Sequence, residues 1–206
     1  NNDGFDPSSS LVGYWPLNDV ENAPVEDISG NGNDGTVQGD VSAVSGQVAN
    51  AALFDGTDDY IQTSYTPSLS DSLSIVAWVS VPTTKSGRRQ IVSPDDAGFD
   101  WSLLYDENNN WALFHGGGVL SGPSVTTGKA TQVAGVWDIE NSETRLYIDG
   151  NRKKTGPIST GSTTNTLRIG DNPDFNENFN GWIDDVRIYD RALSDTEVAD
   201  LYNETN

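Results

Sequence analysis

One aspartate stands where a buried apolar side chain is expected. The stretch 179–189 alternates like a strand, and with a period of two Val186 and Ile188 share a face with Trp182 and Asp184. An aspartate in the apolar register of a strand is costly to bury unless it is paired, hydrogen-bonded or bound to a metal. Asp184 is therefore the first candidate for a functional site.

An early loop, residues 27–36, is rich in oxygen-bearing side chains and glycine and offers Asp184 partners. Asp27 and Asn31 stand at positions one and five of a calcium-binding loop, and a glycine follows at position six. The twelfth position is Gln38 where an EF-hand has a bidentate glutamate, and no helices flank the loop, so an EF-hand is excluded. An incomplete shell of oxygens of this kind needs an acid from elsewhere in the fold.

The two segments together predict one Ca²⁺ site. Asp27 and Asp184 supply carboxylates, and Asn31 or Asn33 with backbone carbonyls complete about six to eight oxygens. The ion would tie the early loop to the last strand. In the alternative interpretation, Asp184 accepts hydrogen bonds from loop amides and the Asn-Gly run is only a turn.

Aromatic residues beside acidic and amide side chains indicate a second kind of site. Sugars bind by stacking a C–H face on an aromatic ring while polar groups hold their hydroxyls. Two tryptophans each follow an acidic stretch, and residues 174–180 form another oxygen-rich segment. The candidate ligand-binding residues chosen on this basis are Trp101, Trp111, Asp96, Asp106, Asn176 and Asn178. Core burial of both tryptophans and a plain solvated loop at 174–180 are the alternatives.

Catalytic machinery is sparse in this chain. His115 is the single histidine, no G-x-S-x-G elbow is present, and without cysteine there is no thiol nucleophile. Glycoside hydrolysis needs two carboxyls about 5 Å or about 6.5–9.5 Å apart. Glu140 and Glu143 lie at a polar turn, and Asp184 and Asp185 point to opposite faces of a strand. We therefore expect a binding protein rather than an enzyme.

Charge narrows the choice of partners. The 206 residues carry a net charge of −20, with 31 acidic and 11 basic side chains. Such a surface repels nucleic acids and anionic membranes, whereas neutral or cationic glycans are compatible with it. An excess of aspartate with few lysines is also typical of halophilic proteins, because in about 1 M salt the Debye length is only about 3 Å. An acidic extracellular protein with several weak calcium sites is the other interpretation.

The sequence carries no membrane-spanning or targeting signal. No apolar run reaches the 18 or so residues of a membrane span, and neither a signal peptide nor any methionine is found. We therefore expect a mature or excised module of a secreted or cell-surface protein, from a halophilic organism or its virus.

Short strands separated by turn residues predict an all-β domain. The stretch Leu73–Val81 is apolar on both faces, which is typical of a central strand of a β-sandwich. The other expected strands, ahead of the closing one, are Leu11–Leu17, Ala51–Phe54, Tyr60–Thr63, Arg89–Ser93, Trp101–Tyr105, Trp111–His115, Gln132–Ile139, Thr144–Ile148, Arg152–Lys154 and Leu167–Gly170. Ser194 and Glu197 form a capping box at the start of one short C-terminal helix. We expect a flexible segment over 1–10 and a single domain over 11–206.

Six motifs occur in a familiar order along the chain. They are Leu11-Val12-Gly13-Tyr14-Trp15-Pro16-Leu17, Ser29-Gly30-Asn31-Gly32-Asn33, Leu53-Phe54-Asp55-Gly56-Thr57-Asp58-Asp59-Tyr60-Ile61, Ile75-Val76-Ala77-Trp78-Val79, Leu146-Tyr147-Ile148-Asp149-Gly150 and the stretch Gly181–Leu193. In this order they resemble the motifs of a concanavalin A-like domain of the laminin-G-like jelly-roll type, related to the pentraxins. The resemblance covers the chain from Leu11 to Tyr202. It implies a two-sheet antiparallel jelly-roll β-sandwich, frequent calcium binding and recognition of carbohydrate or surface ligands.

The sequence thus predicts a non-catalytic, calcium-binding recognition module whose first candidate ligand is carbohydrate. Its expected partners are a glycan or surface glycoprotein and other protein modules of a larger chain. The alternative is a protein–protein adhesion or structural module of a surface layer, appendage or viral spike, with no sugar ligand.

Overall fold

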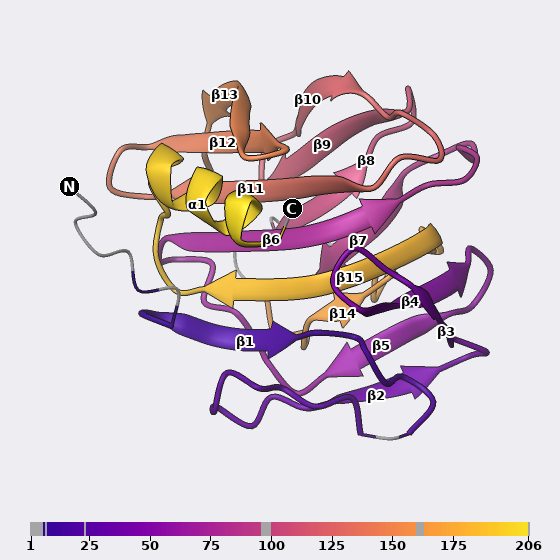
Figure 1. The fold of residues 1–206 in the computed structure, drawn as a ribbon. Helices are drawn as coiled ribbons and strands as arrows, with labels where there is room; N and C mark the ends of the chain where they lie inside the picture. The colour runs from indigo at the N-terminus through magenta and orange to yellow at the C-terminus, as the bar shows by residue number, and fades with distance from the viewer. Residues whose placement is uncertain (1–5, 7, 23, 96–99, 160–162, 206) are drawn as a thin grey trace.

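Two antiparallel sheets packed face to face form a β-sandwich with one helix on its outside (Figure 1). The structure is a computed structural model that describes residues 6, 8–22, 24–95, 100–159 and 163–205. The eight-stranded sheet runs in the order β13 (Asn151–Pro157), β12 (Glu143–Ile148), β11 (Thr131–Asp138), β6 (Leu73–Ser80), β15 (Asn180–Tyr189), β4 (Asn50–Asp55) and β3 (Ser42–Ser45), and β1 (Leu11–Trp15) also pairs with β15. The seven-stranded sheet runs in the order β10 (Val119–Ser124), β9 (Asn110–His115), β8 (Trp101–Tyr105), β7 (Arg89–Ser93), β14 (Arg168–Ile169), β5 (Tyr60–Thr63) and β2 (Gly35–Gln38).

The predicted all-β sandwich is confirmed, and each expected strand is present with boundaries shifted by a few residues. Three strands were not expected from the sequence, namely β2, β3 and β10. Each of the three is an edge strand of its sheet. An edge strand is paired on one side only, so its sequence needs little of the apolar pattern that marks a central strand.

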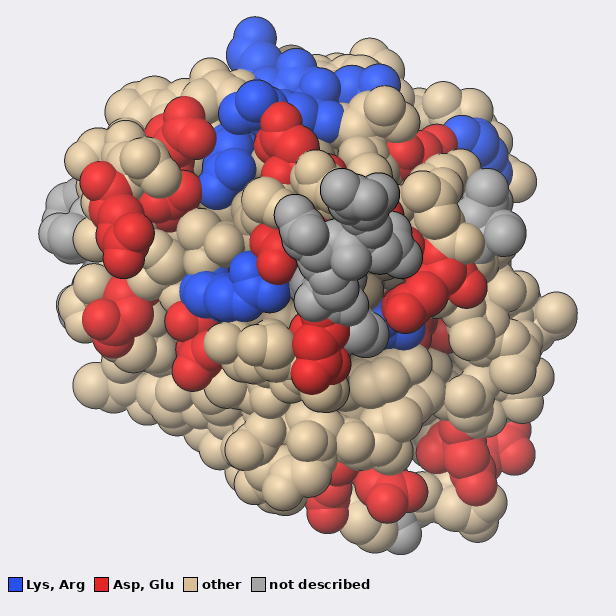
Figure 2. Space-filling model, turned by 60° about the vertical axis from the view of Figure 1, so that its left-hand side comes forward, with Lys and Arg blue, Asp and Glu red and all other residues tan. Residues whose placement is uncertain are grey.

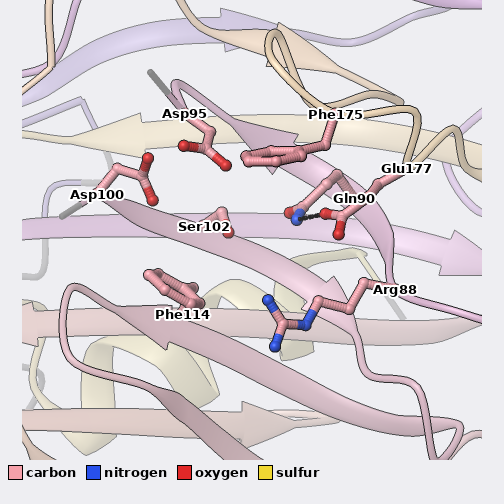
Figure 3. Close-up of a pocket in the computed structure, with 8 residues that line it drawn as sticks. All are labelled: Arg88, Gln90, Asp95, Asp100, Ser102, Phe114, Phe175 and Glu177. Atoms are coloured by element: carbon pink, nitrogen blue, oxygen red, sulfur yellow. Dashed lines mark hydrogen bonds between the residues drawn. The ribbon is translucent and has the colours of Figure 1, made fainter. Parts of the chain in front are cut away.

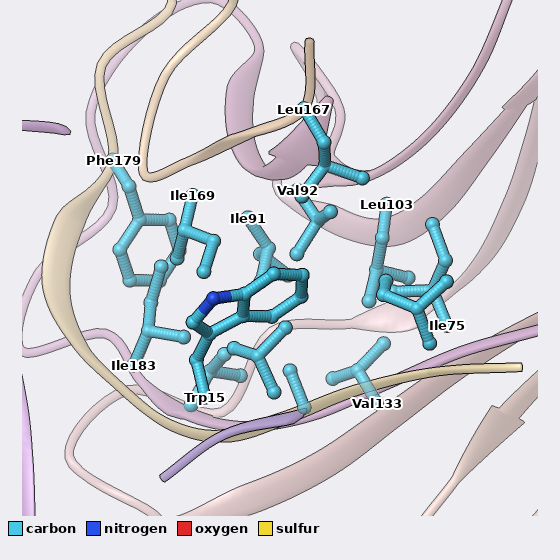
Figure 4. Close-up of a cluster of buried hydrophobic side chains, with 14 of the residues drawn as sticks. Trp15, Ile75, Ile91, Val92, Leu103, Val133, Leu167, Ile169, Phe179 and Ile183 are labelled. Atoms are coloured by element: carbon cyan, nitrogen blue, oxygen red, sulfur yellow. The ribbon is translucent and has the colours of Figure 1, made fainter. Parts of the chain in front are cut away.

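The core lies between the inner faces of the two sheets (Figure 4). Trp15 and Ile75 enter it from the eight-stranded sheet, and Ile91 and Leu103 enter it from the seven-stranded sheet. The Trp15 indole also donates a 2.9 Å hydrogen bond to the Asn33 carbonyl, so the 27–36 loop is fastened to the core.

The helix α1 (Asp195–Thr205) covers part of the outer face of the eight-stranded sheet (Figure 1). The predicted capping box is confirmed: the Ser194 amide donates to Glu197 Oε2 at 2.7 Å, and the Glu197 amide donates to Ser194 Oγ at 3.3 Å. Val198 and Leu201 are buried against the sheet. The apolar stripe of the helix is therefore a docking face.

The strand β15 changes phase at Asp185. This residue has φ of +53°, and the pairing of β15 with β6 shifts register between Asp184 and Arg187. As a result Ile183 and Val186 both face the core although they are three residues apart. A bulge of this kind adds one residue to a strand and reverses the alternation beyond it. The expectation that Asp184 shares a face with Val186 and Ile188 is therefore wrong.

A charge pair next to the bulge is buried as well. Arg187 is largely buried, with Nη2 3.2 Å from Asp185 Oδ2 and Nη1 3.1 Å from Glu204 Oε2 at the end of α1. Its guanidinium carbon lies 4.6 Å from the centroid of the Tyr14 ring. The pair therefore links β1, β15 and the helix.

The predicted flexible segment 1–10 lies mostly outside the described residues and stays a prediction. No helix in the described part of the chain is long and apolar enough to cross a membrane.

The surface is acidic with a basic edge. Figure 2 shows acidic side chains spread over one face, with Lys and Arg gathered mainly along its top, at the height of β13 in Figure 1. β13 carries Arg152, Lys153 and Lys154 in succession, and all three are exposed. Charged side chains on an edge strand discourage pairing with other chains.

Candidate binding pocket

A pocket of about 210 Å³ opens on the outer face of the seven-stranded sheet (Figure 3). It is lined by Arg88, Gln90, Asp95, Asp100, Ser102, Phe114, Phe175 and Glu177. Gln90 on β7, Ser102 on β8 and Phe114 on β9 lie outside the core cluster, which takes their strand neighbours Ile91 and Leu103. Since successive side chains of a strand point to opposite faces, these three form the outward-facing floor.

The segment after β14 closes one side of the pocket and is fastened to β7. The Gln90 amide donates to the Glu177 carbonyl at 2.9 Å, and Gln90 Nε2 donates to Glu177 Oε2 at 2.6 Å. Asn172 Nδ2 donates to Glu177 Oε2 at 3.2 Å and to Asp95 Oδ2 at 2.7 Å. These bonds hold Phe175, which lies two residues before Glu177, at the pocket.

Two phenyl rings border the pocket. Phe175 is 52% exposed, and Phe114 is half-buried. The Arg88 guanidinium carbon lies 5.7 Å from the Phe114 centroid, and its Nε lies 3.2 Å from Glu107 Oε2. Figure 3 shows Asp95 and Asp100 at one end of the pocket and Arg88, Gln90 and Glu177 at the other. Aromatic faces beside several hydrogen-bonding groups suit a hydroxylated ligand.

The structure places both candidate tryptophans in the core, which corrects the expectation that they bind ligand. Trp101 and Trp111 are almost fully buried. The Trp101 ring stacks on Trp137 with centroids 5.8 Å apart, and its Nε1 donates to the Ser159 carbonyl at 3.0 Å. Their indoles occupy the inner face of the sheet, so it is the neighbours of Trp101 in sequence, Asp100 and Ser102, that reach the pocket.

Asp106 is also not a ligand-binding residue in this arrangement. Its Oδ1 accepts the amides of Asn108 and Asn110 at 2.9 Å each, and its Oδ2 accepts the Ser121 hydroxyl at 2.6 Å. The side chain is buried and organises the turn between β8 and β9. Asp96 lies outside the described residues.

The segment 174–180 does border the pocket, as one of the two interpretations of its sequence suggested. Asn176 is exposed and Asn178 is buried, but neither lines the pocket. Phe175, which precedes Asn176, and Glu177, which lies between the two asparagines in sequence, do line the pocket. The available signal was a phenylalanine among polar residues, although the same segment holds a second one, Phe179, which is buried in the core.

Asp27 organises its own loop. Its Oδ1 accepts the amides of Tyr14 and Ser29 at 2.8 and 2.9 Å, and its Oδ2 accepts the Asn33 amide at 2.8 Å. Burial alone would raise the pKa of Asp27, but these hydrogen bonds to the carboxylate outweigh it and lower the pKa. The Nδ2 atoms of Asn31 and Asn33 donate to the carbonyls of β1.

Asp184 holds a different loop. Its Oδ2 accepts the amides of Gln47 and Val48, between β3 and β4, at 2.9 and 2.8 Å. Its Oδ1 is buried without a hydrogen-bond partner among the described residues, and burial, aided by the charge of Asp185, raises its pKa to about 7. Asp27 and Asp184 thus serve separate loops, as in the alternative interpretation, and this arrangement does not fit one shared Ca²⁺ ion.

In the described ranges, one group of three acidic side chains has oxygens within 4.8 Å of one another, namely Asp55, Asp58 and Asp59. Asp59 accepts the amides of Asp40 and Asp55 at 2.7 and 2.8 Å. The Lys85 ammonium lies beside this turn, 2.8 Å from the Asp55 carbonyl, and already supplies a positive charge there. Calcium binding therefore stays a prediction without an assigned site.

The chain belongs to the concanavalin A-like lectin/glucanase superfamily, because the laminin-G-type family model of that description matches residues 55–199. No curated protein sequence matches the chain.

Solved structures share the fold over nearly the whole chain. Domain 4 of the GH43 extracellular arabinanase AbnA from Geobacillus stearothermophilus, in complex with arabinotriose, has a TM-score of 0.76 and 23% identity over 94% of this chain and 98% of that chain. The binding domain of Paraclostridial Mosquitocidal Protein 1 has a TM-score of 0.75 and 18% identity over 97% of this chain and 53% of that chain. The binding domain of botulinum neurotoxin DC in complex with SialylT has a TM-score of 0.74 and 15% identity over 98% of this chain and 53% of that chain. The chain thus spans about half the length of these toxin domains.

Proposed function

We propose that this domain is a non-catalytic carbohydrate-binding module of a secreted or cell-surface protein, and that its glycan binds in the pocket on the seven-stranded sheet. The observation that carries the proposal is Phe175. This phenyl ring is more than half exposed, yet its loop is fastened to β7 through Glu177. An exposed aromatic ring held beside fixed polar groups is the arrangement that stacks on a sugar ring and holds its hydroxyls.

The similar structures support the same class of ligand. The arabinanase domain was solved with arabinotriose and one toxin domain with SialylT. Their identity to this chain is low, so the glycan class comes to this protein as part of the proposal. The small volume of the pocket, below the range of about 300–1,000 Å³ that is usual for drug-sized ligands, suits a single sugar residue of a longer glycan.

The proposal that the module is non-catalytic has its own support. The similar structures described above include two binding domains, and the sequence has neither a nucleophile elbow nor a second histidine. Incubation with the glycan that binds best should release no reducing ends. Hydrolysis that is lost in Asp100→Asn would make the pocket an active site instead.

The test is a glycan array followed by calorimetry with the best-binding glycan. Phe175→Ala should weaken binding about tenfold or more, which corresponds to about 1.4 kcal/mol. The matched control is Ile28→Ala, since Ile28 is 50% exposed and lies in another loop. Equal affinity in the two variants would contradict the proposed site, and no binding across the array would favour the adhesion-module alternative.

A further inference from the structure

The pocket carries more acid than base. Its eight lining residues include three carboxylates, Asp95, Asp100 and Glu177, but one guanidinium, Arg88. The charge of Arg88 is shared with Glu107, which lies outside the lining at 3.2 Å from Arg88 Nε. A ligand entering the pocket therefore meets a negative potential, which the net charge of −20 reinforces at long range.

The hydrogen-bonding groups of the pocket are mainly acceptors. Gln90 is only 3% exposed, and its Nε2 is used by Glu177 Oε2 at 2.6 Å. That bond fixes the amide orientation, because the reverse orientation would set two oxygens against each other. Gln90 Oε1 is then buried, with no hydrogen-bond partner in the described part of the chain. A buried acceptor left unpaired is costly, so the pocket favours a ligand that donates hydrogen bonds.

A bare metal ion is a poor match for these groups. The carboxylate oxygens of Asp95, Asp100 and Glu177 are not among the described sets of three that come within 4.8 Å of one another. A divalent ion needs its oxygen ligands gathered into one tight shell. A ligand that carries an ammonium on a larger hydroxylated ring differs from a metal ion, because its charge can meet the carboxylates at one end of the pocket while its hydroxyls reach acceptors elsewhere and its C–H face lies on a phenyl ring.

We propose that the pocket selects a sugar residue that carries a free amino group, so that the glycan is of the glucosamine type rather than neutral or anionic. This inference rests on the proposed function, since it names the class of glycan bound at the same site. The ammonium group donates to the carboxylates of Asp95 and Asp100 at one end of the pocket, and Phe114 and Phe175 contact the ring. N-acetylation removes the charge and two of the three donors, and it adds bulk in a small pocket.

The experiment is calorimetry with glucosamine oligosaccharides, N-acetylglucosamine oligosaccharides of the same length and linkage, and arabinotriose. The amine form should bind at least about tenfold more tightly than the acetylated form at low salt. Asp100→Asn should reduce that preference several-fold, whereas Glu140→Gln, the same loss of charge at an exposed position away from the pocket, should leave it unchanged. Arg88→Gln should act in the opposite direction and strengthen binding of the amine form.

Each outcome decides between the two proposals. Equal or tighter binding of acetylated or neutral sugar that Phe175→Ala still weakens would overturn the amine selectivity and leave the glycan site in place. A preference for the amine that Asp100→Asn and Arg88→Gln do not change would mean attraction to the acidic surface as a whole, and would also overturn the inference. Because Arg88 is partly exposed, the Arg88→Gln arm stays readable even if Asp100→Asn does not fold. Binding of none of the sugars, or binding insensitive to Phe175→Ala, would contradict the proposed function itself.

Discussion

Gln90 and Glu177 are joined twice, through the backbone amide and carbonyl at 2.9 Å and through Nε2 and Oε2 at 2.6 Å. The two residues are far apart in sequence, one on β7 and one in the segment between β14 and β15. Their pairing fixes two features at once, the position of the loop that carries Phe175 and the orientation of the Gln90 amide. The loop that forms this side of the pocket is therefore held in place before a ligand binds.

Glu177→Ala should make the loop that carries Phe175 more mobile. The side-chain bonds from Gln90 and Asn172 are lost while the backbone bond remains, so the fold should survive. We expect glycan affinity to fall about tenfold and amide hydrogen exchange over residues 172–178 to quicken. Calorimetry and hydrogen exchange measure the two effects. Glu140→Ala is the control, and exchange unchanged from the wild type would show that Glu177 does not hold the loop.

Asp184 should make stability depend on pH in a direction that is unusual for an aspartate. Its pKa is about 7 in the folded protein against an ordinary value of 3.8, so between these values the unfolded chain has released a proton that the folded protein keeps. Stability therefore falls as pH rises from about 4 to about 7, by at most about 4 kcal/mol.

Asp184→Asn tests this pH dependence. Its amide oxygen can still accept the Gln47 and Val48 amides, but the side chain no longer titrates, so urea unfolding should give a flatter stability profile from pH 4 to pH 7. A smaller slope remains from Asp171, whose pKa burial also raises. Below pH 4, Glu197 has the opposite effect on stability. Its pKa is lowered to about 2 in the folded protein, so stability falls as the pH drops toward that value. A variant with the full wild-type slope would contradict this account of Asp184.

Local side-chain chemistry made part of this fold predictable. The capping box of Ser194 and Glu197 depends on residues three apart, so its pattern is complete within the sequence. The bulge at Asp185 is different, because β15 pairs with β6 on both sides of Asp185, with β4 before it and with β1 after it. The bulge shifts the alternation of side chains between the two faces of β15, and these partner strands impose it. No residue pattern near Asp185 indicates it, so the sequence-based prediction placed Asp184 on the wrong face.

The residues that line the pocket could not be predicted from the sequence alone either, and several of the predicted ones are off by one position. The sequence indicated β8 and the 174–180 segment, with Trp101 and Asn176 as the predicted ligand-binding residues, whereas Ser102 and Phe175 line the pocket. Which alternate side chains of β8 face outward is decided by where the strand sits in the sandwich. That position depends on long-range packing such as the stacking of Trp101 on Trp137.

Calcium binding remains a prediction from the family resemblance, and the structure makes one part of it testable. Because Asp184 is occupied by two loop amides, a chelator should change the melting temperature of the wild type and of Asp184→Asn by the same amount. Differential scanning calorimetry with Ca²⁺ and with EDTA measures this. An EDTA effect present in the wild type and absent in the variant would restore Asp184 as a calcium ligand.

Salt should stabilise the protein through its charge alone. With a net charge of −20, repulsion among carboxylates is strong at about 0.1 M salt, where the Debye length is about 10 Å, and weak at about 1 M. The melting temperature in KCl should rise steeply over that range. A flat profile would argue against adaptation to high salt.

The most direct test of the glycan site is a two-dimensional ¹H–¹⁵N NMR titration with the glycan that binds best on the array. The largest shift changes should fall on the Gln90 side-chain amide, on the backbone amides of Ser102 and Phe114, and on residues 172–178. The glycan site would be contradicted if these signals did not move and the shift changes fell instead around Ile28 or on Trp182 of the opposite sheet.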